Sequence, residues 1–136
     1  MKHRVIWLLA LLPVVFTGCT FNTTNTNTGT GTGYKDITPY QAKARLDSEE
    51  GIILLDVRTE EEYAQEHIPG SILIPVDELE AQAPVLFTEK GAPIFIYCMS
   101  GRRSVSAALI LVRLGYIDVY NLGGIIDWPY EKAKGV

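Results

Sequence analysis

The stretch of sequence that decides the fold is Pro93-Ile94-Phe95-Ile96-Tyr97-Cys98-Met99-Ser100-Gly101-Arg102-Arg103-Ser104. Its first five residues are an apolar, β-prone run, as expected for a strand that is covered on both faces. From Ser104 to Leu114 the residues are apolar nearly all round, and Gly115 then supplies a C-terminal stop, which predicts a buried helix. A short polar loop containing a cysteine therefore joins a buried strand to a buried helix.

Capping patterns predict two further helices toward the N-terminus. Thr38-Pro39-Tyr40-Gln41 combines an N-cap, a proline at the first helical position and a glutamine three residues after the cap, which predicts a helix through Leu46. The apolar run 52–57 then predicts a strand that is covered on both faces. Thr59-Glu60-Glu61-Glu62 is a second capping box, with acidic residues in the first turn of the next helix.

Weaker signals complete the domain. Residues 72–74 and 118–122 are short strand candidates, and residues 77–87 are a helix candidate that Pro84 interrupts. Gly123-Gly124 lacks the spacing of a nucleotide-binding loop and is interpreted as a tight turn. The alternation predicts a single α/β domain with a mostly parallel central sheet flanked by helices. In such sheets, sites form at the carboxyl ends of strands, where the cysteine loop begins.

The N-terminus is typical of a bacterial signal peptide over residues 1–18. A basic start precedes an apolar run from Val5 to Phe16, which is shorter than the roughly 20 residues that a membrane-spanning helix needs. Gly18-Cys19 resembles a lipobox, so we expect a lipid on Cys19 to anchor the protein to the extracytoplasmic face of the bacterial membrane. A Cys19→Ala variant should leave the membrane fraction, whereas continued membrane binding would favour an uncleaved signal anchor.

The rest of the chain divides into a tether and one domain. Residues 19–34 are uncharged and rich in Thr, Asn and Gly, which predicts a flexible tether, and residues 35–136 suffice for one core. The net charge is −4, and losing Lys2 and Arg4 with the leader makes it more negative, so we expect no nucleic-acid binding. We expect no metal, because no cluster of His, Cys or carboxylate residues remains at ligand spacing.

Cys98 is the candidate nucleophile. If Cys19 is acylated, a disulfide between the two cysteines is excluded, and a lone thiol in an exported protein is a candidate reactive group. A short loop with a glycine can turn successive N–H groups inward, and the following helix adds the positive end of its dipole, so residues 99–103 should favour a thiolate. A buried structural cysteine is the alternative, against which the flanking Ser, Gly and two Arg argue.

Charged residues at the predicted helix start and after the strand at 52–57 are further candidates. A cation at a helix N-terminus opposes the dipole, so Arg103 indicates a bound anion, whereas a solvated basic patch is an equal alternative for Arg102. Asp56 and Arg58 also follow a strand, so we expect them at the same end of the sheet as Cys98. An ordinary ion pair between Asp56 and Arg58 remains the alternative to a role in the site.

Four ordered motifs resemble the rhodanese family of single-domain sulfurtransferases, and they cover about residues 35–130. The family's active-site loop runs Cys, two residues, Gly, one residue, Arg or a small polar residue, then Ser, and the match falls on Cys98, Gly101, Arg103 and Ser104. The other motifs are Asp56-Val57-Arg58 with Glu62-Tyr63, then His67-Ile68-Pro69-Gly70-Ser71 leading to Ile74-Pro75, then Gly123-Gly124 with Trp128.

The resemblance implies a thiosulfate sulfurtransferase that works without a cofactor, and we expect a monomer. Cys98 would take the outer sulfur of a donor such as thiosulfate as a persulfide and pass it to a thiol or cyanide acceptor. The resemblance also implies that Asp56 and Arg58 brace the loop or its entrance, and that the turn at His67 is structural. Donor binding would fall to the loop itself, namely to Met99, Ser100, Gly101, Arg102, Arg103 and Ser104. Met99 departs from the family, because many competent members carry there an arginine that helps to bind a dianionic donor.

Two other classes of function remain open. Cysteine-dependent phosphatases and arsenate reductases also place a thiolate in an anion-binding loop before a helix, but their arginine lies six positions after the cysteine. Here the sixth position is Ser104, and the arginines come at positions four and five, so the loop is one residue short for a tetrahedral oxyanion. The third class is a module that binds a partner or relays sulfur to a dedicated protein acceptor.

Overall fold

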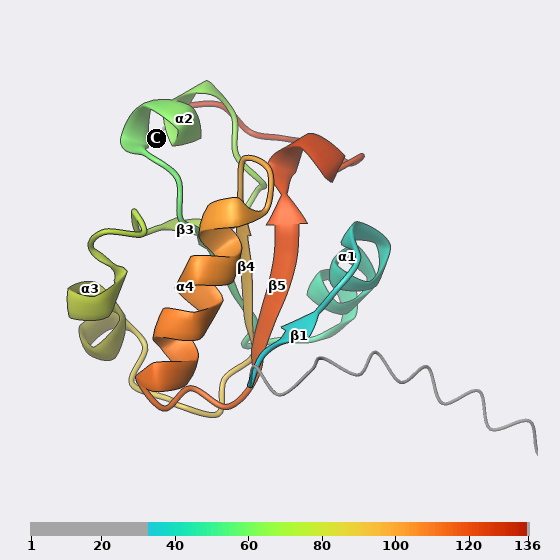
Figure 1. The fold of residues 1–136 in the computed structure, drawn as a ribbon. Helices are drawn as coiled ribbons and strands as arrows, with labels where there is room; N and C mark the ends of the chain where they lie inside the picture. The colour runs from blue at the N-terminus through green and yellow to red at the C-terminus, as the bar shows by residue number, and fades with distance from the viewer. Residues whose placement is uncertain (1–32, 136) are drawn as a thin grey trace, which may run out of the picture.

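A five-stranded parallel sheet forms the centre of the molecule in the computed structural model, which describes residues 33–135 (Figure 1). All of its strand pairings are parallel, and β4 occupies the middle of the sheet. Its strands follow the order β1 (Lys35–Asp36), β5 (Val119–Gly124), β4 (Ile94–Cys98), β2 (Ile53–Asp56) and β3 (Ile72–Leu73). The predicted α/β fold with a parallel central sheet is confirmed, and Cys98 lies at the carboxyl end of the central strand.

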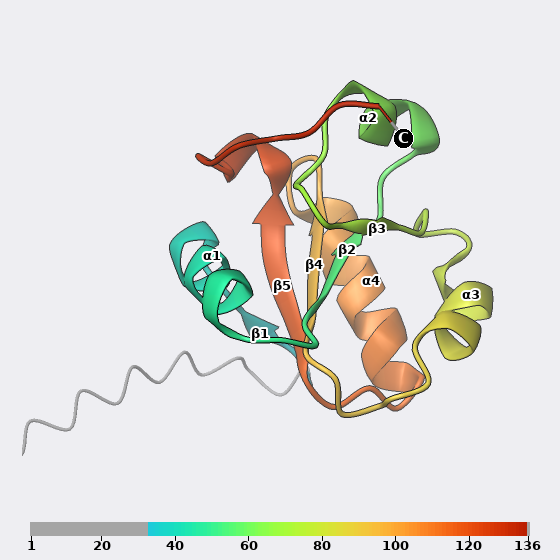
Figure 2. The ribbon, with the colours of Figure 1, turned by 180° about the vertical axis from the view of Figure 1, so that it is seen from behind.

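Helices cover both faces of the sheet (Figures 1 and 2). Helix α1 (Pro39–Ser48) lies on one face, whereas α3 (Leu79–Leu86) and α4 (Arg102–Arg113) lie on the other. The short helix α2 (Glu60–Gln65) lies beyond the carboxyl ends of the strands, and the C-terminal segment returns beside it. The capping boxes predicted at the starts of α1 and α2 are both formed, which confirms those two helix starts.

Alternation along β4 divides the buried side chains into two cores. Ile94, Ile96 and Cys98 face the core under α3 and α4, whereas Phe95 and Tyr97 face the core under α1. Every residue of β4 is buried, as a strand between two helical layers requires. Burying each large apolar side chain contributes about 1.5–3 kcal/mol, so β4 is held firmly from both sides.

Helix α4 begins two residues earlier than the sequence predicts, at Arg102 rather than Ser104. Gly101 has a φ of 95°, a left-handed conformation that favours glycine, and it forms the N-cap at which the chain turns into the helix. The loop is therefore only three residues long, and both arginines lie in the first helical turn. The expectation of an all-round buried helix is wrong, because Ser106 and Leu109 are exposed and only one face packs on the sheet.

Other boundaries also differ from the prediction. Pro84 lies inside α3 without ending it, because the helix continues to Leu86 with Pro84 on its exposed side. Gly123-Gly124 is no tight turn but the end of β5, where the register to β4 shifts. The sequence gives no signal for β1, because two polar residues at a sheet edge show no apolar pattern.

The predicted signal peptide, Cys19 and nearly all of the tether fall outside the described residues, so they stay predictions. Tyr34, predicted as the last residue of the tether, packs partly against the core, so ordered structure starts slightly earlier than residue 35. Between residues 33 and 135, the helices are all too short or too polar to cross a bilayer.

Candidate active site

The Cys98 side chain lies in a cradle of backbone groups between β4 and α4, formed by residues 99–104. The N–H of Gly101 donates a hydrogen bond to Cys98 Sγ at 3.1 Å. Cys98 is only 1% exposed, so the sulfur lies on the floor of the cradle. The loop turns tightly enough to do this because Gly101 adopts its left-handed conformation directly before the helix.

The cradle favours the thiolate form of Cys98. Burial raises the pKa of the Cys98 thiol, but the nearby donors, namely the backbone N–H groups of Ser104, Ser100 and Gly101 and the Ser104 hydroxyl, outweigh burial and lower the pKa below its usual value. The start of a twelve-residue helix adds its positive end to the same point. These groups all favour the charged form of Cys98 over the neutral thiol.

Ser104 connects the cradle to the neighbouring strand β5. Its hydroxyl is fully buried and lies 2.7 Å from Asn121 Oδ1 and 2.9 Å from the Gly101 carbonyl. Asn121 Oδ1 also accepts the Gly123 N–H at 3.1 Å, and its amide donates to Asp36 at 2.9 Å. Sequence reasoning did not identify Asn121, although a single polar residue inside the run 118–122 was an available signal.

Gly124 lets β5 lie against the cysteine loop. A Cβ at this position would stand 2.4 Å from the Met99 carbonyl oxygen and 2.7 Å from Ser100 Cα, which are both backbone atoms. Neither atom can move away without displacing the loop. The glycine pair that the sequence suggests as a turn therefore serves as a bulged strand end that supports the cradle.

Arg103 is paired with Glu62 of α2. Its guanidinium donates two hydrogen bonds of 2.7 Å, one to each Glu62 carboxylate oxygen. The bond to Arg103 holds the pKa of Glu62 at about 2, so the pair is fully charged at neutral pH. Arg103 is close enough to Cys98 for the thiolate to help raise the pKa of the guanidinium. The cation at this helix start thus has a resident anion, a partner from distant sequence that the helix pattern did not reveal.

Asp56 and Arg58 form a buried ion pair and do not line the cradle. Arg58 Nη2 lies 2.7 Å from Asp56 Oδ2 and 2.6 Å from the Glu66 carbonyl oxygen, and both side chains are fully enclosed. Arg58 Nη1 has no hydrogen-bond partner in the described part of the chain. Direct contact of these two residues with a donor is therefore not supported, and the ion-pair alternative is the one that the structure favours.

The turn around His67 attaches to the active-site strand through Tyr97. The Tyr97 hydroxyl accepts the Ile68 N–H at 3.0 Å and lies 2.9 Å from Ser71 Oγ. The His67 ring stacks on Tyr63 at 3.8 Å, and its Nδ1 lies 2.9 Å from the Tyr63 carbonyl oxygen. These contacts agree with a structural turn that fixes β4 directly before Cys98.

The remaining predicted loop residues differ in exposure. Ser100 and Arg102 are exposed at the rim, whereas Met99 is half-buried against the core under α1. The Met99 carbonyl accepts the Ile126 N–H at 3.4 Å. This hydrogen bond holds the loop against the segment that follows β5. The structure therefore brings together Cys98, the loop N–H groups, Ser104 and Arg103, leaves Arg102 exposed, and sets Met99 toward the supporting side.

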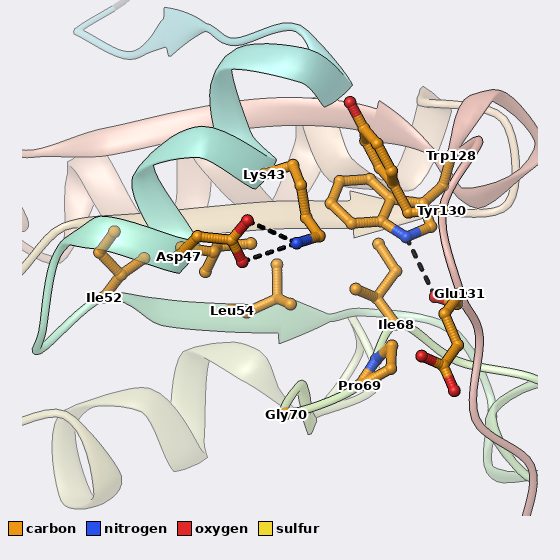
Figure 3. Close-up of a pocket in the computed structure, with 11 residues that line it drawn as sticks. Lys43, Asp47, Ile52, Leu54, Ile68, Pro69, Gly70, Trp128, Tyr130 and Glu131 are labelled. Atoms are coloured by element: carbon orange, nitrogen blue, oxygen red, sulfur yellow. Dashed lines mark hydrogen bonds and ion pairs between the residues drawn. The ribbon is translucent and has the colours of Figure 1, made fainter.

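A separate hollow of about 390 Å³, here called the α1 cavity, lies on the other face of the sheet (Figure 3). Lys43 and Asp47 of α1 pair with each other at 2.6 Å on its rim. Trp128 Nε1, on the opposite wall, donates to the Glu131 carbonyl at 3.3 Å. Residues 33–135 hold no group of three His, Cys, Asp or Glu side chains placed to bind a metal ion, either here or at the cradle.

Comparison with known proteins agrees with this geometry. The Rhodanese-like domain family matches residues 38–130. The chain is similar to thiosulfate sulfurtransferase PspE of Escherichia coli, with 40% identity over 81 residues, covering 60% of this chain and 78% of the relative. It is also similar to thiosulfate sulfurtransferase GlpE of Pseudomonas fluorescens, with 36% identity over 107 residues, 75% of this chain and 94% of the relative.

Solved structures show the same likeness. A structure described as rhodanese with anions from E. coli has 38% sequence identity and a TM-score of 0.59, covering 62% of this chain and 99% of that one. A rhodanese-like domain protein from Staphylococcus aureus has 32% identity and a TM-score of 0.63, covering 75% and 99%. With its parallel sheet, cysteine cradle and matched residues 38–130, the chain belongs to the rhodanese-like domain family.

Proposed function

We propose that this rhodanese-type sulfurtransferase carries sulfur as a persulfide on Cys98, taking it from a donor such as thiosulfate and passing it to a thiol or cyanide. The observation that carries the proposal is a buried cysteine sulfur at a helix start that accepts the Gly101 N–H and has further donors nearby that lower its pKa. A thiolate is the nucleophilic form of cysteine, and these donors lower the pKa of Cys98 and so favour that form. The names of relatives such as PspE and GlpE add independent support for the reaction class.

The proposed step is a displacement at sulfur. The Cys98 thiolate attacks the outer sulfur of thiosulfate, a new S–S bond forms, and the old S–S bond breaks with its electron pair leaving on sulfite. The persulfide carries one negative charge, so the same N–H groups that hold the thiolate can hold the product. Attack by the acceptor on the outer sulfur then returns the Cys98 thiolate.

The tightness of the cradle favours sulfur transfer over phosphate chemistry. Only three residues separate Cys98 from Arg102, and Arg103 is already engaged with Glu62. A slim terminal sulfur can approach a side chain that is 1% exposed, whereas a tetrahedral phosphate needs room for several oxygens. Relay of sulfur to a protein acceptor would use the same Cys98 persulfide. It differs from transfer to a small thiol or cyanide only in the acceptor of the second step.

The experiment compares the purified protein with a Cys98→Ser variant. We expect the wild type to release sulfite from thiosulfate in the presence of cyanide, to gain one sulfur on Cys98 by intact mass, and to leave an aryl phosphate uncleaved. The variant should lose both sulfur transfer and the added mass. Phosphatase turnover that disappears in Cys98→Ser, without any sulfur transfer by the wild type, would show that the assignment is wrong.

A further inference from the structure

The cradle has two arginines beside it but only one unpaired positive charge. Arg103 is held by Glu62 through two hydrogen bonds of 2.7 Å, while Arg102 is exposed and has no ion-pair partner among residues 33–135. Glu62 is itself fixed, because its carboxylate also accepts the Thr59 N–H at 3.0 Å in the capping box of α2. The carboxylate therefore remains beside the cradle as a permanent negative charge.

We propose that Glu62 sets the charge preference for the sulfur donor by neutralising Arg103, which turns the site away from dianionic donors and toward donors with less charge. This inference rests on the proposed sulfur transfer and concerns its donor. Glu62 acts as a positioning residue through Arg103 rather than as a catalytic residue. With Glu62 present, the two arginines and the glutamate give the rim a formal charge of about +1 rather than +2.

The charge matters because donor and nucleophile repel each other. Thiosulfate brings two negative charges toward a thiolate, so positive groups at the rim must offset that repulsion. Met99 supplies no charge at the loop, and Glu62 offsets one of the two arginines. The Arg103 and Glu62 side chains are 34% and 23% exposed, so solvent screens their effect only in part.

Two donors of similar shape separate charge from fit. Thiosulfate carries two negative charges and leaves as sulfite, whereas methanethiosulfonate, with a methyl group in place of one anionic oxygen, carries one and leaves as methanesulfinate. In both reactions the outer sulfur passes to Cys98, the donor S–S bond breaks, and the leaving anion takes the electron pair. The ratio of kcat/KM for thiosulfate to kcat/KM for methanethiosulfonate therefore reports the charge at the rim.

The central variant is Glu62→Gln. Glutamine also completes a capping box and has nearly the same volume, so the helix start should persist while one negative charge is lost. We expect kcat/KM for thiosulfate to rise about fivefold, which is the upper end of the effect of one partly exposed charge. For methanethiosulfonate we expect a rise of about twofold, because the Coulomb energy scales with the charge of the donor. The difference should shrink at high salt, where the Debye length falls to about 3 Å.

Three further proteins complete the test. Glu60→Gln removes the same charge from the same helix at an exposed side chain that forms no ion pair within residues 33–135, so it should leave the donor ratio unchanged. Arg103→Gln should lower the ratio below that of the wild type. The double variant Glu62→Gln/Arg103→Gln returns the rim to the wild-type charge, so its donor ratio should return to the wild-type value even if its overall rate is lower.

The outcomes distinguish this inference from the proposed function. An ordered series of donor ratios, highest in Glu62→Gln, intermediate in the wild type and the double variant, and lowest in Arg103→Gln, supports it. Ratios that are equal in all variants, or rates for both donors that fall together in Glu62→Gln, overturn it while sulfur transfer stands. If the wild type takes sulfur from neither donor, the sulfur-transfer proposal itself fails.

Discussion

The Cys98 cradle and the α1 cavity are two hollows on opposite faces of the same sheet, and they differ in where their polar groups point. The α1 cavity is roomy, about 390 Å³, and its Lys43 pairs with Asp47 while the Trp128 Nε1 donates to the Glu131 carbonyl (Figure 3). In the cradle, which encloses a cysteine only 1% exposed, the sulfur accepts the Gly101 N–H, and the donors of Ser100 and Ser104 nearby also lower its pKa. We therefore expect reactivity to depend on donors placed around the sulfur and not on the volume of a hollow.

The two hollows also differ in what builds them. The α1 cavity lies between side chains of α1, β2 and the segment after β5, and flexible side chains such as Lys43 form its rim. The cradle is backbone, fixed by the end of β4, the start of α4 and the bulged end of β5. We therefore expect the cradle to respond to small steric changes and the cavity rim to tolerate larger ones.

The largest effect should come from Gly124→Ala. The added Cβ would meet the Met99 carbonyl oxygen at 2.4 Å, so β5 or the loop must shift by a few tenths of an ångström or more. We expect a loss of about 1–3 kcal/mol in the free energy of unfolding, as for overpacked cores, and a loss in kcat/KM of about a hundredfold. Denaturant unfolding and sulfite release measure the two effects. Gly91→Ala, which has open space around its Cβ, is the control, and equal behaviour of the two variants would contradict the tight approach.

A middle effect should come from Ser104→Ala. Removing the hydroxyl takes away one of the groups that lower the pKa of Cys98, so the pKa should rise and the rising limb of the pH–rate profile should move to higher pH. At neutral pH, kcat/KM should fall about two- to tenfold, the range of one net hydrogen bond, and recover as the pH is raised.

The rate of Cys98 alkylation by iodoacetamide against pH gives an independent reading of the same titration. Ser106→Ala on the exposed side of α4 is the matched control and should leave the profile in place. A uniform loss of rate at every pH in Ser104→Ala would mean that Ser104 only supports the fold.

The smallest effect should come from Lys43→Gln in the α1 cavity. The change breaks an exposed i,i+4 pair with Asp47, which contributes about 0.3–0.5 kcal/mol to the free energy of unfolding. We expect sulfur transfer to stay within about twofold of the wild type with either donor, since the cavity offers no group to Cys98. A tenfold loss of kcat/KM at unchanged stability would show that the cavity belongs to the reaction site.

Most of the fold could be predicted from the sequence because its signals are local. The Thr38 and Thr59 capping boxes need only four consecutive residues. Apolar side chains alone predict a buried strand at 93–97, which the structure has at 94–98. The sequence predicts the start of α4 two residues too late, because the N-cap is Gly101, which has no side chain to indicate a cap. The extent of β5 was missed because Gly123-Gly124 fits a turn and a bulged strand end equally well.

The sequence by itself determined the chemistry that the site can carry. A cysteine directly follows a buried strand, a glycine lies in the short loop, and a helix then begins whose first N–H groups can favour an anion. Only the tertiary structure decided which charges remain free and which close approaches support the loop. The Arg103–Glu62 pair joins residues 41 positions apart, Ser104 meets Asn121 across 17, and Gly124 abuts the Met99 carbonyl. The physical reason is that backbone geometry follows from local propensities, whereas ion pairs and contacts between strand ends depend on where packing brings distant segments together.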